Sequence, residues 1–125
     1  MDDKLVHEIH QLHDQVCDAL GNPSRVLILY ALRDQPRFVT DMALELDIPQ
    51  SSVSRHLKVL RDRGLVLPRR EGAAVYYELT DMRVIEALDL LRGIMTDRLH
   101  RQVEIAEGEF GGKRPRDPAV DKGSE

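Results

Sequence analysis

The sequence is poor in cysteine and in aromatic residues, and both shortages restrict what the protein can be. Its one cysteine, Cys17, excludes an intramolecular disulfide and is typical of the reducing cytoplasm, where we expect this protein to be. Aromatic residues make up 4% of the chain, and tryptophan is absent. We therefore predict an aliphatic core and no platform of aromatic rings on which nucleotide bases could stack.

Long hydrophobic runs are also missing. The longest, around residues 26–31, is far shorter than the roughly 20 residues that cross a bilayer. The N-terminal segment MDDKLVHEIH is acidic and amphipathic, unlike a secretory signal. At 125 residues the chain is long enough for one domain with its own core, so we expect a single domain and no membrane partner.

The formal net charge of −4 argues against a polyanionic partner, but the distribution of charge argues for one. Residues 50–70 hold six cations against Asp62 alone, whereas the segments on both sides are net acidic. The local field, rather than the net charge, steers a charged ligand. The basic segment is therefore a candidate nucleic-acid surface, with a chance cluster of solvated side chains as the alternative.

Apolar spacing predicts an amphipathic helix over residues 5–20 that ends at Gly21. Asn22 followed by Pro23 is a strong helix start, since asparagine caps and proline suits the first turn. The second predicted helix, residues 23–33, is apolar almost all round and should be buried. The stripe of the first helix consists of Leu5, Ile9, Leu12, Val16 and Leu20.

Two short helices are predicted next, on either side of a tight turn. Thr40 can cap a helix over residues 41–46, residues 47–49 form the turn, and the following helix ends at Gly64. Such a pair is a helix-turn-helix, whose second helix is placed to enter a groove of DNA.

The outer face of that second helix is unusual because, from residue 50 to residue 60, it carries no carboxylate. Opposite its apolar stripe lie hydroxyl and cationic side chains, which suit phosphate oxygens and acceptor-rich base edges. His56 lies beside the apolar stripe, so we expect it to be packed or to touch a phosphate rather than to read a base. The apolar stripe is Val53, Leu57 and Leu60, and the donors opposite are Ser51, Ser54, Arg55 and Lys58.

Two β-prone runs flank residues 71–74, where Gly72 favours a hairpin turn. Arg69 and Arg70 lie where the first strand meets this turn. A basic hairpin directly after a recognition helix is typical of a wing. A plain hairpin packed on the core would explain the strands but not the arginine pair.

Thr80 or Asp81 is predicted to cap a last helix that ends near residue 107. A small domain cannot cover its long apolar stripe, so we expect this helix and the first one to form a homodimer surface. The predicted domain, residues 1–107, is mainly α with a small β-hairpin wing (α+β), a winged helix-turn-helix of about five helices. Residues 108–125 are rich in glycine, proline and charge and are expected to be a disordered tail. The stripe comprises Val84, Leu88, Leu91, Met95, Leu99, Val103 and Ala106.

Three segments, in this order and spacing, resemble the ArsR/SmtB family of winged-helix repressors: ALGNPSRVLILYAL, DMALELDIPQSSVSRHLKVLRDRGLV and PRREGAAVYYEL. The resemblance covers about residues 12–80. It implies a homodimer that binds an imperfect palindromic operator and leaves it when an inducer binds. Pro49 stands where the family often has serine, but its fixed φ still suits a helix entry. By position, the implied DNA contacts are Gln50, Ser51, Ser52, Ser54, Arg55, His56 and Lys58, with Arg69 and Arg70 in the wing.

Two metal sites of the family are not expected here. The thiolate site needs cysteines that RFVTDMALEL lacks, and the last-helix site needs histidines where Arg83, Ile94 and Asp97 stand. A different cluster could hold Zn²⁺, Ni²⁺ or Cu, although a solvated helix face with a half-buried cysteine is the favoured interpretation, and no cofactor is assigned. This cluster consists of His7, His10, His13 and Cys17, with His100 from a partner subunit.

Two other classes of function remain as alternatives. A winged helix can bind protein instead of DNA, although the basic segment disfavours such an interaction module. His13 and Cys17 have the spacing of a thiol dyad, but no orienting partner or oxyanion donor accompanies them, so we predict that the protein is not an enzyme.

Overall fold

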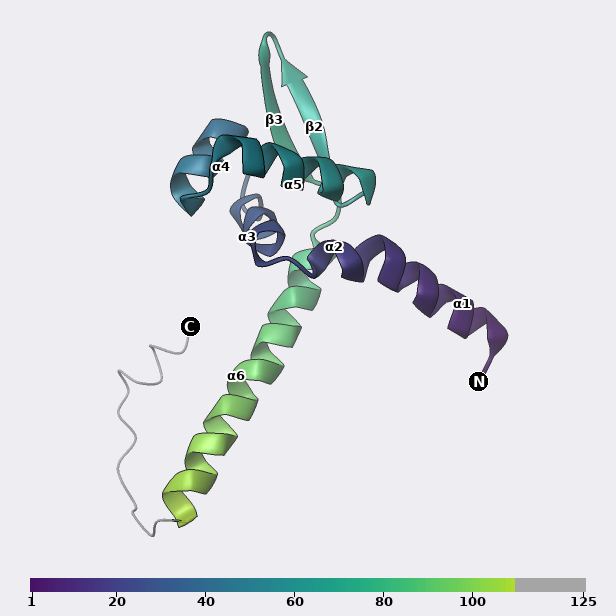
Figure 1. Ribbon diagram of the computed structural model, residues 1–125, viewed down its shortest axis with the longest axis vertical. Helices are drawn as coiled ribbons and strands as arrows, with labels where there is room; N and C mark the ends of the chain where they lie inside the picture. Colours follow the sequence, from purple (N-terminus) through teal and green to yellow (C-terminus); the bar gives the residue numbers. More distant parts are fainter. Residues whose placement is uncertain (110–125) are drawn as a thin grey trace. The chain divides into compact units, whose positions relative to one another are not determined.

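The computed structural model describes residues 1–109, and the predicted tail lies outside these residues from position 110 onward. The described residues divide into two units, one of residues 1–85 and one that begins at residue 86. The first unit contains the whole helix-turn-helix and the hairpin (Figure 1).

The predicted first helix is present as one helical run in three parts. The α-helix α1 spans Asp3–Leu12, a π-helical turn η1 spans His13–Cys17, and α2 spans Asp18–Leu20. Gly21 is the C-cap of α2, as predicted. The π turn was not predicted, because one extra residue in a helix leaves no mark in a short apolar pattern.

Helix α3 spans Pro23–Ala31, and Asn22 caps it as predicted. The Asn22 side chain accepts hydrogen bonds from the amides of Ser24, at 2.9 Å, and Arg25, at 3.3 Å. The helix ends before the predicted Arg33, because the Arg33 amide bonds to the carbonyl of Tyr30, three residues back, in a tightened last turn.

Strand β1, Arg37–Phe38, was not predicted, and it corrects the start of the next helix. Phe38 is extended and pairs with Tyr76 of strand β3, which spans Ala74–Leu79. Phe38 is also the N-cap of α4, which spans Val39–Leu46. Thr40 is therefore inside the helix and not its cap. A strand of two residues is too short to show a periodicity, so only pairing with β3 reveals it.

The turn and the second helix of the helix-turn-helix are found where predicted. Asp47 adopts a left-handed conformation, with φ 53°, and Pro49 is the N-cap of α5, which spans Gln50–Asp62. Gly64, with φ 76°, follows the C-cap residue Arg63 and reverses the chain toward the sheet.

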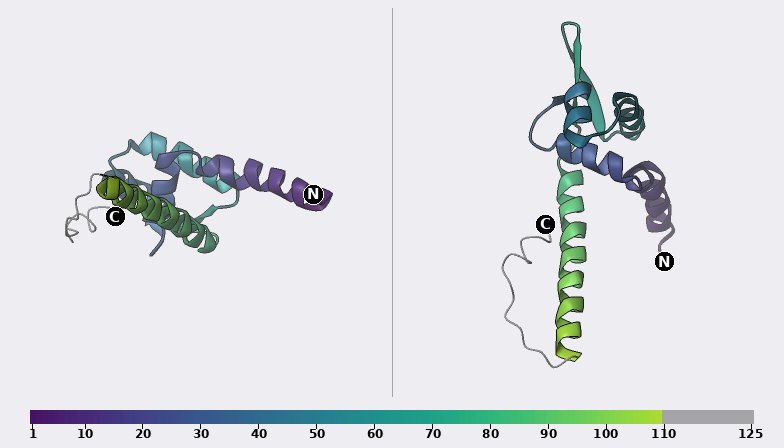
Figure 2. Two further views of the ribbon diagram at one scale, coloured as in Figure 1. Left: turned by 90° about the horizontal axis from the view of Figure 1, so that it is seen from below. Right: turned by 60° about the vertical axis from the view of Figure 1, so that its left-hand side comes forward.

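The predicted wing is the hairpin of β2, Val66–Glu71, and β3, Ala74–Leu79. Gly72, with φ 62°, opens its two-residue turn. With β1 the hairpin becomes a three-stranded antiparallel sheet of order β1-β3-β2. The tip of the hairpin projects beyond the helices of this unit (Figures 1 and 2).

The core is aliphatic, as the composition predicted. Helix α5 lies across the base of the hairpin and packs on α3 and α4 (Figure 1). Burial of one such aliphatic side chain contributes about 1.5–3 kcal/mol, so the inner stripe fixes which face of α5 stays outside. The largest fully buried side chains are Ile28, Leu29, Met42, Val53, Leu57, Leu60 and Val66.

Helix α6 spans Arg83–Glu109 and continues two residues beyond the predicted end. Asp81 receives the amide of Arg83 at 2.9 Å, as a capping side chain does. Six large apolar side chains along the helix are more than half exposed, in addition to Leu99 at 50%. No helix within residues 1–109 combines the length and the hydropathy that crossing a bilayer requires. The six are Leu90, Leu91, Ile94, Met95, Val103 and Ile105.

Candidate nucleic-acid interface

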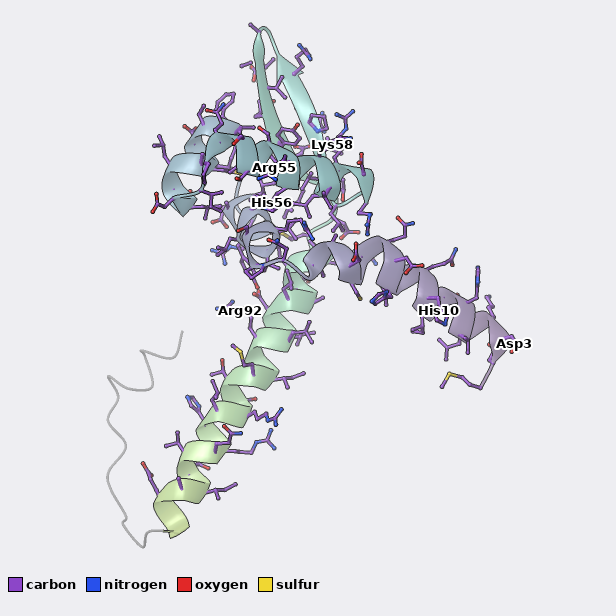
Figure 3. The ribbon with its side chains drawn as sticks, in the orientation of Figure 1. Asp3, His10, Arg55, His56, Lys58 and Arg92 are labelled. Atoms are coloured by element: carbon purple, nitrogen blue, oxygen red, sulfur yellow. The ribbon has the colours of Figure 1, made fainter. Side chains whose placement is uncertain are left out.

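The outer face of α5 presents the hydrogen-bond donors that were predicted for it from the sequence. Because Val53, Leu57 and Leu60 are fully buried, the opposite side of the helix faces outward. Figure 3 labels Arg55 and Lys58 on this helix. The exposed members of the predicted set are Gln50, Ser51, Ser54, Arg55 and Lys58, whereas Ser52 and His56 are half-buried.

Arg55 is oriented by a neighbour one turn back. Its Nη2 donates a hydrogen bond of 3.1 Å to the Ser52 hydroxyl. Within residues 1–109 it has no acidic partner, so its charge is not neutralised. A guanidinium held in this way keeps donors for a guanine edge or a phosphate and loses less entropy on binding.

Lys58 marks the point at which the donor-only face ends. Its Nζ lies 3.5 Å from a carboxylate oxygen of Asp62, one turn further along α5. Both side chains are exposed, and such pairs contribute little, about 0.3–0.5 kcal/mol. Lys58 can therefore exchange this partner for a phosphate at small cost, while Asp62 limits the surface on this side.

His56 is half-buried and lies on the side of α5 toward α3 (Figure 3). Burial lowers the pKa of its imidazole, and the nearby charges of Arg25 and Arg55 lower it further. The ring is thus neutral at pH 7 and can give one hydrogen bond. Its place beside the apolar stripe is as predicted, and its contact with DNA stays a prediction.

The two wing arginines, predicted as a pair, are placed differently. In Arg69, Nε donates a 2.6 Å hydrogen bond to the carboxylate of Glu78 across the hairpin, and this bond raises the pKa of Arg69. Arg70 faces the other side of the hairpin and, within residues 1–109, has no acidic partner. Only one of the two arginines is therefore left with an unpaired charge.

Arg61 and Arg63, two cations of the predicted basic segment, were not predicted as site residues. Arg61 lies three residues beyond Lys58 on α5 and lines a cavity together with Arg70. The helical period could have found Arg61, because three residues bring the chain back to the same side of the helix.

Arg63 connects the end of α5 to the N-terminal helical run. Its guanidinium donates to the main-chain carbonyl of Asp14 and, at 2.7 Å, to the carboxylate of Asp18, whose pKa it lowers. A π turn interrupts the regular i to i−4 bonding of a helix, and here a carbonyl of that turn is satisfied by an arginine from 49 residues away in sequence. No sequence pattern indicates this contact.

Four residues of the proposed metal cluster lie on the outside of the N-terminal helical run, and the fifth, His100, lies on α6. Cys17, in the π turn, is exposed, which corrects the expectation of a half-buried thiol; the neighbouring Val16 and Ala19 are the more covered residues of this segment. His13 Nδ1 lies 3.3 Å from a carboxylate oxygen of Asp14. Among residues 1–109 no three histidine, cysteine or acidic side chains lie close enough together to hold a metal ion. The remaining members, His7, His10 and His100, are distributed over exposed positions of α1 and a half-buried position of α6.

At the family's other metal position, Arg83 binds Asp81 through Nη2 and Oδ2 at 2.8 Å. This contact lowers the pKa of Asp81 to about 2. The carboxylate that resembles a metal ligand in sequence thus has an arginine as its partner.

Comparison with known proteins agrees with this arrangement. A family model described as "Bacterial regulatory protein, arsR family" matches residues 22–67. The transcriptional regulator NmtR of Mycobacterium tuberculosis is 46% identical over 71 residues, 57% of this chain and 59% of NmtR. The chain thus spans less than two thirds of that relative.

Other relatives match over a longer part of their length. The nodulation protein NolR of Rhizobium meliloti is 33% identical over 91 residues, which is 73% of this chain and 75% of NolR. The solution structure of the homodimeric winged helix-turn-helix DNA-binding domain of a possible ArsR-family regulator from Mycobacterium bovis matches with a TM-score of 0.62 and 26% identity, covering 93% of this chain and 97% of that one. With a winged helix-turn-helix fold, a matching family model and 33% identity to a relative over 75% of that relative's length, the chain belongs to the ArsR family.

Proposed function

We propose that this protein is a sequence-specific DNA-binding repressor of transcription. The observation that carries the proposal is the outer face of α5, where hydroxyl, amide and cationic side chains from Gln50 to Lys58 are exposed without a carboxylate among them. Phosphates and base edges need donors of this kind. Bound to the chromosome, the protein would act in the cytoplasm.

The proposed active form is a homodimer. Helix α1 exposes a row of apolar side chains, Leu5, Val6, Ile9 and Leu12, and α6 exposes the longer row described above. Exposed apolar rows of this length indicate a protein interface, and the M. bovis domain is a homodimer. Two copies of α5 would then address the half-sites of a palindromic operator about one DNA turn apart.

The proposed specificity contacts are Gln50, Ser51, Ser54 and Arg55, with Ser52 orienting Arg55 and with Lys58 and His56 at phosphates. The test is fluorescence anisotropy with a duplex from the region upstream of the protein's own gene and with a scrambled duplex of equal length. We expect tighter binding to the upstream duplex and a steep loss of affinity with salt. Equal affinity for both would refute sequence-specific repression, and binding to neither would favour the protein-interaction module.

A metal-responsive repressor is the second candidate, because His13 and Cys17 are both exposed on the π turn to which Arg63 is bonded. A Zn²⁺, Ni²⁺ or Cu ion on these ligands and on side chains of a partner subunit could release the operator. Native mass spectrometry of the protein and of His13→Ala, with each metal added, tests this role. We expect one ion per site in the wild type and its loss in the variant, and a metal-free spectrum at saturating metal would exclude the site.

A further inference from the structure

A cavity of about 480 Å³ lies between the wing and the two helices of the helix-turn-helix. Its walls are half-buried apolar or aromatic side chains: Val39 at the start of α4, Pro68 of β2, and Val75 and Tyr77 of β3. Its polar lining is two exposed arginines, Arg61 of α5 and Arg70 of β2, and no carboxylate lines it.

The strand register explains why Arg70 faces this cavity. Pro68 pairs with Tyr77 and Arg70 pairs with Val75, so these four side chains share one face of the hairpin. The face on the other side holds Arg69, which pairs with Tyr76 and is bonded to Glu78. Although the two arginines are adjacent in sequence, Arg69 is therefore bonded to a carboxylate and Arg70 faces the cavity.

The two arginines of the cavity are also the cations of the basic segment that lack any partner. Of the six cations in residues 50–70, Lys58, Arg63 and Arg69 have acidic partners, and Arg55 is bonded to Ser52. Within residues 1–109, no hydrogen bond or ion pair engages Arg61 or Arg70. Like charges held beside apolar walls repel each other, and an anion between them removes this repulsion.

We propose that this cavity is the binding site of one phosphate group of the DNA backbone. The inference rests on the proposed function. Arg61 lies on α5 one turn beyond Lys58, so the cavity lies between the C-terminal end of the donor face and the wing. On the proposed mode of binding, a DNA strand that runs from α5 to the wing would pass this cavity. Two guanidinium groups offer forked donors that match phosphate oxygens, and the apolar walls strengthen the attraction.

The proposal assigns different tasks to the two wing arginines. Arg70 anchors the wing to the backbone together with Arg61, whereas Arg69 holds the hairpin through Glu78 and contributes no phosphate contact. Because Arg61 and Arg70 share one phosphate, replacing either arginine should weaken DNA binding nearly as much as replacing both. On a diffuse basic surface, by contrast, each lost charge would weaken DNA binding by the same amount.

The experiment is anisotropy at a series of salt concentrations, with the wild type, Arg61→Ala, Arg70→Ala, the double variant and the charge-matched control Arg69→Ala. We expect Arg70→Ala and Arg61→Ala each to bind operator and scrambled duplex roughly tenfold more weakly and to lower the salt slope by about 0.9. The double variant should lower the slope by about the same amount, and Arg69→Ala should leave it unchanged. Arg70→Lys should recover part of the affinity, and thermal unfolding confirms that each variant is folded.

Three outcomes would overturn the inference. Equal losses for Arg69→Ala and Arg70→Ala would show a diffuse field, and a double variant with twice the slope change would show two separate phosphates. If Arg61→Ala and Arg70→Ala bind DNA normally but lose weak binding of inorganic phosphate, detected by NMR, then the cavity serves a free anion. A wild type that binds neither duplex refutes the proposed function itself, which distinguishes that failure from these three.

Discussion

Helices α1 and α5 are both amphipathic, yet only α5 has its apolar side covered within the chain. The exposed fractions of Val53, Leu57 and Leu60 are 0%, whereas those of Leu5, Ile9 and Leu12 are 42%, 51% and 48%. The polar side of α5 is therefore its free surface, whereas α1 is exposed on all sides, its apolar side included. The difference indicates that α5 is positioned by its own chain for an external ligand, while α1 needs a second chain.

The two helices are also connected. Arg63, at the C-cap of α5, bonds to main-chain carbonyls of Asp14 and Gln15 in the π turn that follows α1, and to the carboxylate of Asp18. Arg63 therefore joins the helical run that carries one exposed apolar row to the end of the helix that carries the donor face.

The largest expected effect comes from the covered stripe of α5. Leu57→Ala should lower the free energy of unfolding by about 2–5 kcal/mol, because it leaves a cavity in a fully buried site. Urea denaturation at several protein concentrations measures this loss, which should be the same at all of them. For Ile9→Ala the loss of unfolding free energy should become smaller as the protein is diluted. If both variants showed the same loss at every protein concentration, the apolar side of α1 would not be covered by a second chain.

A charge on the apolar side of α1 should prevent dimerisation. Ile9→Glu is expected to weaken association by about 2–4 kcal/mol, because a carboxylate would be buried in the interface. Sedimentation velocity measures the dimer fraction, and Gln11→Glu adds the same charge as a control. A dimer that withstands Ile9→Glu would mean that α1 is not part of the interface.

A smaller effect is expected on the polar side of α5. Arg55→Ala should cost about 1–3 kcal/mol in operator binding and should reduce the preference for operator over scrambled duplex. Ser52→Ala should also weaken operator binding and reduce the preference for operator, but by less, since it removes only the hydrogen bond that orients Arg55. Both are measured by anisotropy, and an unchanged preference in Arg55→Ala would assign this arginine to a phosphate.

Removing the connection between the two helices should have a modest effect on stability. Arg63→Met keeps the length of the side chain and should cost about 1 kcal/mol, because carbonyls of the π turn lose a donor. Hydrogen exchange should increase in residues 13–19 before it increases in α5. Asp18→Asn, which leaves the carbonyl bonds in place, should have a smaller effect, and exchange rates identical to those of the wild type in Arg63→Met would contradict a link.

The smallest expected effect is a dependence on acid pH. Arg63 holds the pKa of Asp18 below 3.8, its usual value. The folded state therefore binds this proton less readily than the unfolded state. The resulting stabilisation is present above about pH 4 and is lost as the pH falls through the lowered pKa. Acid unfolding of Asp18→Asn should lack this contribution, and identical acid midpoints for both proteins would contradict it.

Most of the fold could be predicted because its signals are local. Asn22 followed by Pro23 predicts the start of α3, and Gly72 predicts the turn of the wing. The spacing of Val53, Leu57 and Leu60 predicts which side of α5 is buried. The displaced cap has a tertiary cause. Strand β1, which displaces the predicted cap Thr40, exists only through its pairing with β3, whose residues are distant in sequence. The π turn that contains Cys17 leaves no mark in the apolar spacing.

By itself the sequence determined the order of the helices, the hairpin, the aliphatic core and a donor face on α5, because caps, turns and apolar periods act over a few residues. Only the tertiary structure decided which cations keep a free charge. Arg69 and Arg70 are neighbours with the same charge. Because of the register of β2 on β3, Arg69 lies beside Glu78, whereas Arg70 faces an open cavity. Charges interact through space, and the spatial neighbours of a side chain are fixed only when the chain has folded.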